Sequence, residues 1–389
     1  MEDALSARSL YDRLNRGESL TILDVRNRDE FEAWHIDAPR TVQTPYAEFM
    51  SAKVTDEIPT LADSLALESP VVAVCPRGEA SERVAEMLRD AGIDAKNLAD
   101  GMNGWARVYV AREIDGGSGQ DDATILQYER PSSGCLSYLV ISDGEAAVID
   151  PLREFADRYV EDTRAQGAAL RYAIDTHVHA DHVSGLREVA SATDAEMILP
   201  DGARDRGLAL EAAFVQDGDE IEVGTAALTA IYAPGHTSEM MLFRLGNTLF
   251  SADTLFLDSI GRPDLEGGTS DEVASDGSDR AVDLASDLYE TLHEHVLSLP
   301  DGTVVAPGHV HEKTRRRGDD TFTARLPTVR DSIPLLSVGR DEFVARVASD
   351  LPPRPANYEE IVMVNLGRKT VEDAAAFELE LGPNNCAVQ

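Results

Sequence analysis

The sequence predicts two α/β domains in tandem, of which the first has a parallel sheet and the second has two sheets with helices outside them. Strand-like and helix-like segments alternate up to about residue 112. A segment rich in glycine, aspartate and serine, DGGSGQDD, follows and is typical of a linker. Beyond it the pattern changes to a meander of short strands. We therefore expect a first domain at 1–114, a linker at 115–122, a second domain at 123–334 and a C-terminal extension at 335–389.

The first domain is predicted from two short apolar strands, at 20–25 and 71–74, and from a helix at 80–91. Gly92 follows the helix as a stop signal. Cys75 comes directly after the second strand and just ahead of the helix. The backbone amides of such a turn point inward, an environment that favours a thiolate and binds anions. Cys75 is therefore a candidate catalytic residue.

The second domain begins as a meander and continues with alternating helices and strands. We expect strands at 124–127, 136–142, 146–149, 172–175 and 303–306, further strands between 220 and 251, and helices at 154–167 and 280–299. Two sheets with helices outside them is the simplest architecture for this order.

Composition restricts the partners and the location of the protein. The net charge is −36, with 71 Asp plus Glu against 35 Lys plus Arg, and 43% of the residues are hydrophobic. Together with regular apolar periods, this favours a folded protein with a dense carboxylate surface, as halophiles use, over an acidic disordered chain. Such a surface repels phosphate backbones, so we expect no nucleic-acid partner. We find no secretory signal and no apolar run that could span a membrane, so we expect a cytoplasmic protein without a membrane partner.

The three cysteines, Cys75, Cys135 and Cys386, are too sparse for a disulfide framework, and none belongs to a C-x-x-C pair. Cys135 lies in a strand-like stretch and is interpreted as a packing residue. Cys386 lies in the tail GPNNCAVQ, and its role is left open between a bystander and a resolving or sulfur-carrying thiol.

Metal-binding residue types gather where predicted strands end. The segment H-V-H-A-D-H at 177–182 directly follows a strand, and two further histidines and an aspartate follow other strands beside Gly or Pro. Imidazole and carboxylate groups that separate loops aim at one point can hold a metal ion. The candidate ligands are His177, His179, Asp181, His182, His236, Asp253 and His309.

These segments are similar to the metallo-β-lactamase superfamily. The similar motifs are T-H-V-H-A-D-H at 176–182, P-G-H-T at 234–237, S-A-D-T-L-F at 251–256 and the final His309. The resemblance covers about residues 123–330. It implies an αββα sandwich with the metal at one edge of the sheets.

The superfamily implies two alternative metal centres. A resemblance to glyoxalase II, a thioester hydrolase, implies two zinc ions that share a water molecule of lowered pKa. One metal would bind His177, His179 and His236, the other would bind Asp181, His182 and His309, and Asp253 would bridge them. A resemblance to persulfide dioxygenases implies instead one Fe(II) per chain, held by His177, His236 and Asp253. In that case His179, Asp181, His182 and His309 would orient the ligands or the substrate.

Two features favour iron. The segment L-F-L-D-S-I-G-R-P-D-L at 255–265 looks like the G-R-x-D segment of persulfide dioxygenases, in which the arginine helps to hold the thiol substrate. Arg262 is therefore a candidate substrate-binding residue, and an ion pair with Asp264 is the alternative. The second feature is the domain that precedes the metal domain.

The first domain resembles rhodanese domains over about residues 4–112. The similar segments are L-D-V-R at 23–26 with H-I at 35–36, the loop C-P-R-G-E-A-S at 75–81 and D-G-M-N-G-W at 100–105. The resemblance implies a persulfide on Cys75, with Arg77 offsetting the charge of Glu79 and helping to bind the substrate. Ala80 stands where active rhodaneses often carry arginine, so an inactive binding module is the alternative.

The fusion of these two domains is best explained by sulfane-sulfur chemistry. We expect iron-dependent oxidation of a low-molecular-weight thiol persulfide by O2 to sulfite, coupled to rhodanese-type sulfur transfer. The alternatives are a dinuclear zinc thioester hydrolase, a sulfurtransferase whose metal domain has another role, and a non-enzymatic sulfide-responsive binding protein. The thiol that carries the persulfide, the direction of sulfur transfer and the assembly state, with a homodimer as one option, stay open.

Overall fold

The computed structural model describes residues 4–115, 123–266, 277–311, 314–349, 351–382 and 384–388, without the side chains of 277–279. The chain divides into two compact units, of which the smaller comprises the residues up to Tyr109 together with Arg130–Ser133. The larger comprises Val110–Glu129 and the residues from Gly134 onward, including the C-terminal extension. The division precedes the expected boundary at residue 114 because Val110–Glu113 pairs with a strand of the larger unit. Apart from Asp115, the expected linker lies outside the described residues.

The smaller unit is the predicted α/β domain with a parallel sheet. Its strands run in the order β1-β5-β4-β2-β3, and every neighbouring pair is parallel. The strands are β1 (Ala4–Leu5), β2 (Thr21–Asp24), β3 (Thr41–Gln43), β4 (Val71–Val74) and β5 (Ala95–Leu98). The helices are α1 (Ala7–Asn15), α2 (Arg28–Ala33), α3 (Tyr46–Val54), α4 (Ile58–Ser64), α5 (Glu79–Asp90) and α6 (Gly101–Ala106).

Strand β4 lies in the middle of this sheet, and helices cover both of its faces. All four of its residues are buried, as expected for a strand of a parallel sheet that helices cover on both faces. One face packs against apolar side chains of α3, α4 and α5, such as Phe49 and Val84. Cys75 therefore directly follows a fully buried strand in the middle of the sheet.

The larger unit contains two mixed sheets. The first has the strand order β12-β11-β10-β9-β8-β7-β6 and the second has the order β13-β14-β15-β16-β18-β19. The first sheet consists of β6 (Val110–Glu113), β7 (Ala123–Arg130), β8 (Cys135–Ser142), β9 (Glu145–Ile149), β10 (Ala169–Ile174), β11 (Glu196–Pro200) and β12 (Ala213–Val215). The second consists of β13 (Glu220–Val223), β14 (Ala226–Tyr232), β15 (Met241–Leu245), β16 (Thr248–Ala252), β18 (Val304–Pro307) and β19 (Ala324–Arg325).

A continuous apolar core lies between these two sheets. It joins side chains of the first sheet, such as Tyr138 and Ile149, to side chains of the second, such as Leu228 and Phe250. The rings of Tyr138 and Phe250 have centroids 5.0 Å apart. The predicted αββα sandwich is therefore confirmed.

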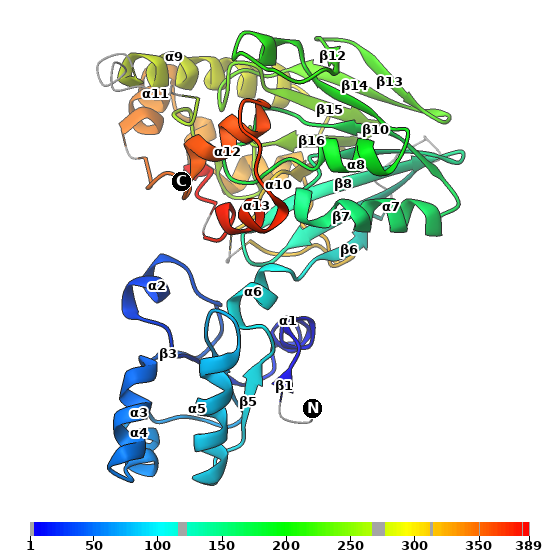
Figure 1. Ribbon diagram of the computed structural model, residues 1–389. Coiled ribbons are helices and arrows are strands. Elements are labelled where there is room, and N and C mark those ends of the chain that lie inside the picture. The colour runs from blue at the N-terminus through cyan, green and yellow to red at the C-terminus, as the bar shows by residue number, and fades with distance from the viewer. Residues whose placement is uncertain are drawn as a thin grey trace. The chain divides into compact units, whose positions relative to one another are not determined.

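Helices cover the outer faces of the sandwich. Figure 1 shows the sheets between α7 and α8 on one side and α9 and α11 on the other. The helices of this unit are α7 (Ala156–Ala165), α8 (Leu186–Ala192), α9 (Gly277–Glu290), α10 (Leu326–Ser332), α11 (Arg340–Ser349), α12 (Tyr358–Asn365) and α13 (Asp373–Leu379). The expected helix at 280–299 ends its regular part at Glu290 and continues as a π-helical turn, Thr291–Val296. Across the described parts of the chain, no helix combines the length and the apolar character needed to cross a bilayer.

A short two-stranded sheet joins the C-terminal extension to the body of the larger unit. Strand β17 (Ile260–Gly261) pairs in antiparallel fashion with β20 (Ala387–Val388). Because β17 lies shortly after Asp253, this pairing brings the extension to the candidate metal centre.

Candidate metal centre

The predicted metal ligands lie on loops that follow different strands. His177 and His236 follow β10 and β14, Asp253 comes directly after β16, and His309 follows β18. One ligand atom from each of His177, His236 and Asp253 lies within 4.8 Å of the others. A single ion with bonds of about 2 Å to each atom can span that spacing. The structure therefore brings together the three residues predicted to hold iron.

His177 is oriented by a chain of hydrogen bonds that begins at Asp150, just after β9 (Glu145–Ile149). The Thr176 hydroxyl donates to Asp150 Oδ2 at 3.0 Å, which leaves its oxygen to accept from His177 Nδ1–H at 2.9 Å. Burial lowers the pKa of His177 well below its ordinary value. The imidazole is thus neutral, and its Nε2 lone pair is available to a metal.

His236 is held in the same tautomer by a different partner. Its Nδ1–H donates to the backbone carbonyl of Arg262 at 2.7 Å, and a carbonyl can only accept. Its Nε2 lies 3.6 Å from Asp253 Oδ2. Burial lowers the pKa of His236, so this imidazole is also neutral and can bind a metal.

His309 lies between the carboxylates of Asp253 and Asp181. Its Nδ1 donates to Asp253 Oδ1 at 2.6 Å and its Nε2 donates to Asp181 Oδ2 at 2.8 Å. Burial disfavours the charge, but the carboxylates of Asp253 and Asp181 outweigh it and raise the pKa of His309 well above its usual range. Both ring nitrogens are therefore occupied as donors in this arrangement.

Asp181 is the centre of a second buried group that also contains Cys135 and His182. Ligand atoms of Cys135, Asp181, His182 and His309 all lie within 4.8 Å of one another. Cys135 Sγ lies 3.3 Å from Asp181 Oδ2, and His182 Nδ1 lies 3.3 Å from Asp181 Oδ1. The second ligand set of a dinuclear centre is thus present, and its members contact one another.

His179, a predicted ligand of the first zinc in the hydrolase interpretation, lies with two other carboxylates. Its Nε2 is 3.1 Å from Asp150 Oδ1 and 3.8 Å from Asp175 Oδ1. Burial raises the pKa of Asp175 to about 6. His179 and His177 have ring centroids 4.1 Å apart. In this geometry His179 supports Asp150, which in turn orients His177 through Thr176.

The first ligand set fits a metal ion because two of its atoms lack other partners. His177 Nε2 and Asp253 Oδ2 are buried and have no hydrogen-bond partner among the described residues. Leaving such atoms unpaired costs about 1–3 kcal/mol each, more for a charged group. A cation bound between them and His236 Nε2 would satisfy both.

Two unusual backbone features beside Asp253 allow its carboxylate to lie in this site. Ala252 has φ of 43°, a left-handed conformation that is strained for a residue with a side chain and occurs mainly at functional sites. A Cβ atom at Gly308 would lie 2.5 Å from Asp253 Oδ1, so only glycine allows the approach of the loop that carries His309. These features fix the position of the Asp253 carboxylate.

In the smaller unit, Cys75 lies at the predicted turn between β4 and α5. Its Sγ accepts a hydrogen bond from Gly78 N at 3.1 Å and lies 3.1 Å from Ser81 Oγ. Gly78 has φ of 100°, a conformation that glycine adopts readily, and it precedes the first turn of α5. The amide at the helix N-terminus therefore points at the sulfur, as expected from the sequence. Arg77 is exposed in the same turn.

Comparison with known proteins identifies both parts of the chain. A family model described as a rhodanese-like domain matches residues 6–108, and one described as the metallo-beta-lactamase superfamily matches residues 131–309. A hydroxyacylglutathione hydrolase from Polaromonas sp. is 33% identical over 205 residues, which are 50% of this chain and 71% of that protein. The chain belongs to the metallo-beta-lactamase superfamily. Its smaller unit is a rhodanese-like domain, and both predicted resemblances are confirmed.

Other proteins that are similar to this chain are named as persulfide dioxygenases rather than as hydrolases. Proteins named mitochondrial persulfide dioxygenase ETHE1 from Homo sapiens and Bos taurus are 29% and 27% identical to it. The alignments cover 67% and 68% of this chain and 95% and 96% of those proteins.

Solved structures show the same fold. A metallo-beta-lactamase from Staphylococcus aureus matches with a TM-score of 0.57 and 26% identity, over 64% of this chain and 74% of that one. ETHE1 from Myxococcus xanthus matches with a TM-score of 0.52 and 24% identity, over 67% of this chain and 100% of that one. The second likeness supports the fold of the metallo-beta-lactamase domain alone.

Arg262 of this metallo-beta-lactamase domain is buried and fully engaged with protein groups. Its Nε and Nη2 pair with the Asp264 carboxylate at 2.7 and 3.0 Å. The remaining three N–H groups donate to the carbonyls of Pro352, Pro353 and Asn385 at 2.8–2.9 Å. All five guanidinium donors are thus used, and the ion pair with Asp264 that was the alternative is formed. A contact between Arg262 and substrate stays a prediction and would require one of these bonds to open.

Two cysteines lie closer to the metal centre than the sequence suggested. Cys135 was interpreted as a packing residue, but it forms an isolated β-bridge with His309 and contacts Asp181. A ligand atom of Cys386 lies within 4.8 Å of those of Asp253 and His309. Burial, followed by the charges of Asp181 and Asp253, raises the pKa of Cys386 well above its usual value. The strand-end position of Cys135 is a local signal, whereas nothing near Cys386 in the sequence points to the site.

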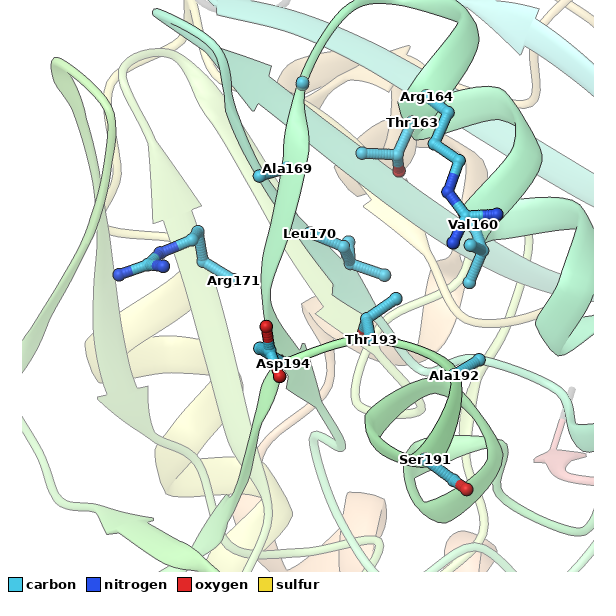
Figure 2. A pocket seen from close by; sticks show the side chains of 11 residues that line it. Val160, Thr163, Arg164, Ala169, Leu170, Arg171, Ser191, Ala192, Thr193 and Asp194 are labelled. Carbon is cyan, nitrogen blue, oxygen red and sulfur yellow. The ribbon is translucent and has the colours of Figure 1, made fainter.

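A cleft in the surface of this domain lies away from the metal centre. This cleft of about 550 Å³ is lined by α7, β10 and the segment that follows α8, as Figure 2 shows. Arg164, Arg171 and Asp194 are among its lining residues, and none of the metal-centre residues contributes to it. The candidate chemistry therefore belongs to the buried histidines and aspartates.

Replacing Thr176 by valine is expected to weaken metal binding by roughly 10- to 100-fold, the usual effect of losing a group that orients a ligand. Valine keeps the shape of the buried side chain but breaks the chain from Asp150 to His177 Nδ1. Competition with a chelator measures the affinity. Thr163→Val is the matched control, because the Thr163 hydroxyl donates only to the Tyr159 carbonyl of its own helix. Equal metal affinity in the two variants would contradict this role.

Proposed function

We propose that the chain oxidises the terminal sulfur of a low-molecular-weight thiol persulfide with O2. The balanced reaction is RSSH + O2 + H2O → RSH + SO3²⁻ + 2 H⁺, in which the sulfane sulfur loses four electrons and O2 gains them. One Fe(II) would be held by His177, His236 and Asp253. Two imidazoles and one carboxylate leave open positions on iron where the substrate sulfur and O2 can meet.

The observation that carries this proposal is the contrast between the two ligand sets. In the first set, His177 Nε2 and Asp253 Oδ2 have no partner among the described residues. In the second, His182 Nε2 and Asp181 Oδ1 also lack a hydrogen-bond partner among the described residues. Both nitrogens of His309, however, are taken by carboxylates, and Cys135 and His182 contact Asp181. This arrangement favours one metal ion beside a hydrogen-bonded network over two metal ions.

The protein groups around the metal would hold the ion, orient its ligands and exclude bulk water. His177, His236 and Asp253 are each 1% exposed, so bulk water is excluded from the reacting atoms. His309 holds a proton between Asp253 and Asp181 and fixes the orientation of the ligating carboxylate. The likeness to proteins named persulfide dioxygenase, over two thirds of the chain, supports the same substrate class.

The rhodanese-like domain would carry sulfane sulfur on Cys75. A persulfide anion at this position would accept hydrogen bonds from the groups that now contact Sγ, the Gly78 amide and the Ser81 hydroxyl. Arg77, exposed in the same turn, would attract an anionic sulfur donor such as thiosulfate.

A second candidate is a dinuclear zinc thioester hydrolase. It is favoured by the complete second ligand set and by the likeness to a hydroxyacylglutathione hydrolase. In that case Asp253 Oδ1 would have to give up its hydrogen bond from His309 and bind a second metal ion instead.

Metal analysis and substrate turnover separate these candidates. Protein purified without oxygen is expected to contain one iron per chain and to consume O2 only when a thiol persulfide is supplied, with release of sulfite. Two zinc ions per chain together with thioester cleavage would contradict the proposal. Absence of turnover with every sulfur substrate and thioester would favour a binding protein.

A further inference from the structure

Asn365, at the end of α12, is a buried residue that touches the metal loop, which we define as residues 177–184. It comes from the C-terminal extension and is 5% exposed. Its Nδ2 donates to the backbone carbonyls of His179 and His182 at 2.9 and 2.8 Å. Its Oδ1 accepts from the backbone N–H of Ser184 at 2.9 Å. One amide side chain thus satisfies three backbone groups of the metal loop.

Asparagine is the residue type that this position requires. The orientation of the amide is fixed, because the two carbonyls can only accept and the Ser184 N–H can only donate. Aspartate would lack both donors and would place a charge against two carbonyl oxygens. Alanine would leave three buried backbone groups of the metal loop without their partner, which is costly for the folded loop.

The neighbouring contacts show that the metal loop rests on the C-terminal extension. Glu380, at the end of α13, accepts a hydrogen bond from the Val183 N–H through Oε1 at 2.8 Å. The Val183 side chain packs against Ile361, Val364 and Ala376 of the same extension. The C-terminal extension therefore supports the metal loop both through backbone hydrogen bonds and through the buried Val183 side chain.

We infer that Asn365 is a positioning residue of the metal centre. The metal loop lies between β10 and α8 and contains no regular strand or helix within residues 177–184. Its conformation therefore depends on side chains that bind its backbone. By holding the carbonyls of His179 and His182, Asn365 fixes the turn that starts at His177 and directs the His177 Nε2 atom toward Asp253. This role is the same whether the metal is iron or zinc, and whichever reaction it serves.

Cobalt(II) binding to the full chain tests this inference without any enzyme assay. Asn365→Asp keeps the size of the side chain and the acceptor for Ser184, but it loses the two donors. We expect the dissociation constant for Co(II) to rise roughly 10- to 100-fold in Asn365→Asp and Asn365→Ala, and the visible absorption band of the bound ion to change.

Asn357→Gly is the matched control. Asn357 precedes the first residue of the same helix, and its side chain donates to the Leu379 carbonyl within the extension. Among the described residues, it makes no hydrogen bond to the metal loop. Its φ of 58° suits glycine, so the backbone is kept. This variant should bind Co(II) as the natural protein does. Circular dichroism and thermal unfolding of the metal-free proteins show whether each variant is folded.

A folded Asn365→Asp variant that binds Co(II) with unchanged affinity and an unchanged spectrum would overturn the inference. If Asn365→Ala does not fold, Asn365→Asp alone decides. An equal loss of Co(II) affinity in Asn357→Gly would also overturn it, because the effect would then belong to the helix as a whole. Failure of the persulfide assay leaves this test unaffected, since its readout is the binding and spectrum of Co(II).

Discussion

Asp253→Ala is expected to remove iron and persulfide-dependent oxygen uptake together. Asp253 supplies the carboxylate of the three-residue ligand set, and its Oδ2 is one of two atoms of that set that are buried without a hydrogen-bond partner among the described residues. Loss of a direct ligand should weaken metal binding by more than the roughly 10- to 100-fold effect of an orienting group. Iron content after anaerobic reconstitution and an oxygen electrode measure the two effects.

Asp181→Asn is the matched control for this experiment. The side chain of Asp181 is as deeply buried as that of Asp253 and contacts His309, but in the proposed centre it does not bind the metal. The variant should therefore keep one iron per chain, with lower affinity because His309 loses a charged partner. If Asp181→Asn loses one of two bound ions, or if Asp253→Ala still binds iron normally, the proposed mononuclear centre is wrong.

Cys75→Ser is expected to abolish sulfur transfer from thiosulfate to cyanide and to leave persulfide-dependent oxygen uptake at its normal level. A serine hydroxyl cannot carry sulfane sulfur, while the ligands of the metal centre all belong to the larger unit. Thiocyanate formation and oxygen uptake, measured on the same preparation, give both values.

Ser81→Ala is the control variant for Cys75→Ser. It keeps Cys75 but removes a hydroxyl that lies 3.1 Å from Sγ, so transfer should fall without vanishing. Normal thiocyanate formation by Cys75→Ser would show that Cys75 is not catalytic. If neither the natural protein nor Ser81→Ala forms thiocyanate, the rhodanese-like domain is a binding module.

Elements with a strong local pattern could be predicted from the sequence. The buried strand at 71–74 and the amphipathic helix after it appear as β4 and α5, and the meander appears as β7, β8 and β9. The boundary between the domains could not be predicted, because Val110–Glu113 has no local feature that shows its pairing with β7. The pairing of strands depends on contacts between segments rather than on their own composition.

The convergence of His177, His236 and Asp253 could be predicted because each follows a predicted strand and histidine and aspartate are typical metal ligands. The groups that orient them could be predicted only in part. His179, Asp181, His182 and His309 were expected in that role, whereas Thr176 and Asn365 were not. Arg262 was expected to face the substrate, yet its guanidinium binds Asp264 and three carbonyls, and only its backbone oxygen reaches His236. Asn365 lies 181–186 positions along the chain from the three residues of the metal loop that it contacts. A single asparagine forms no sequence motif that would indicate this contact.

The pairing of β17 with β20 bears on how the protein matures. A ribosome extends the chain from its N-terminus, and by residue 349 it has supplied His177, His236, Asp253 and His309. The groups that hold their loops, Asn365 and the strand Ala387–Val388, are synthesised afterwards. Stable metal insertion would thus follow translation of residues 365–388.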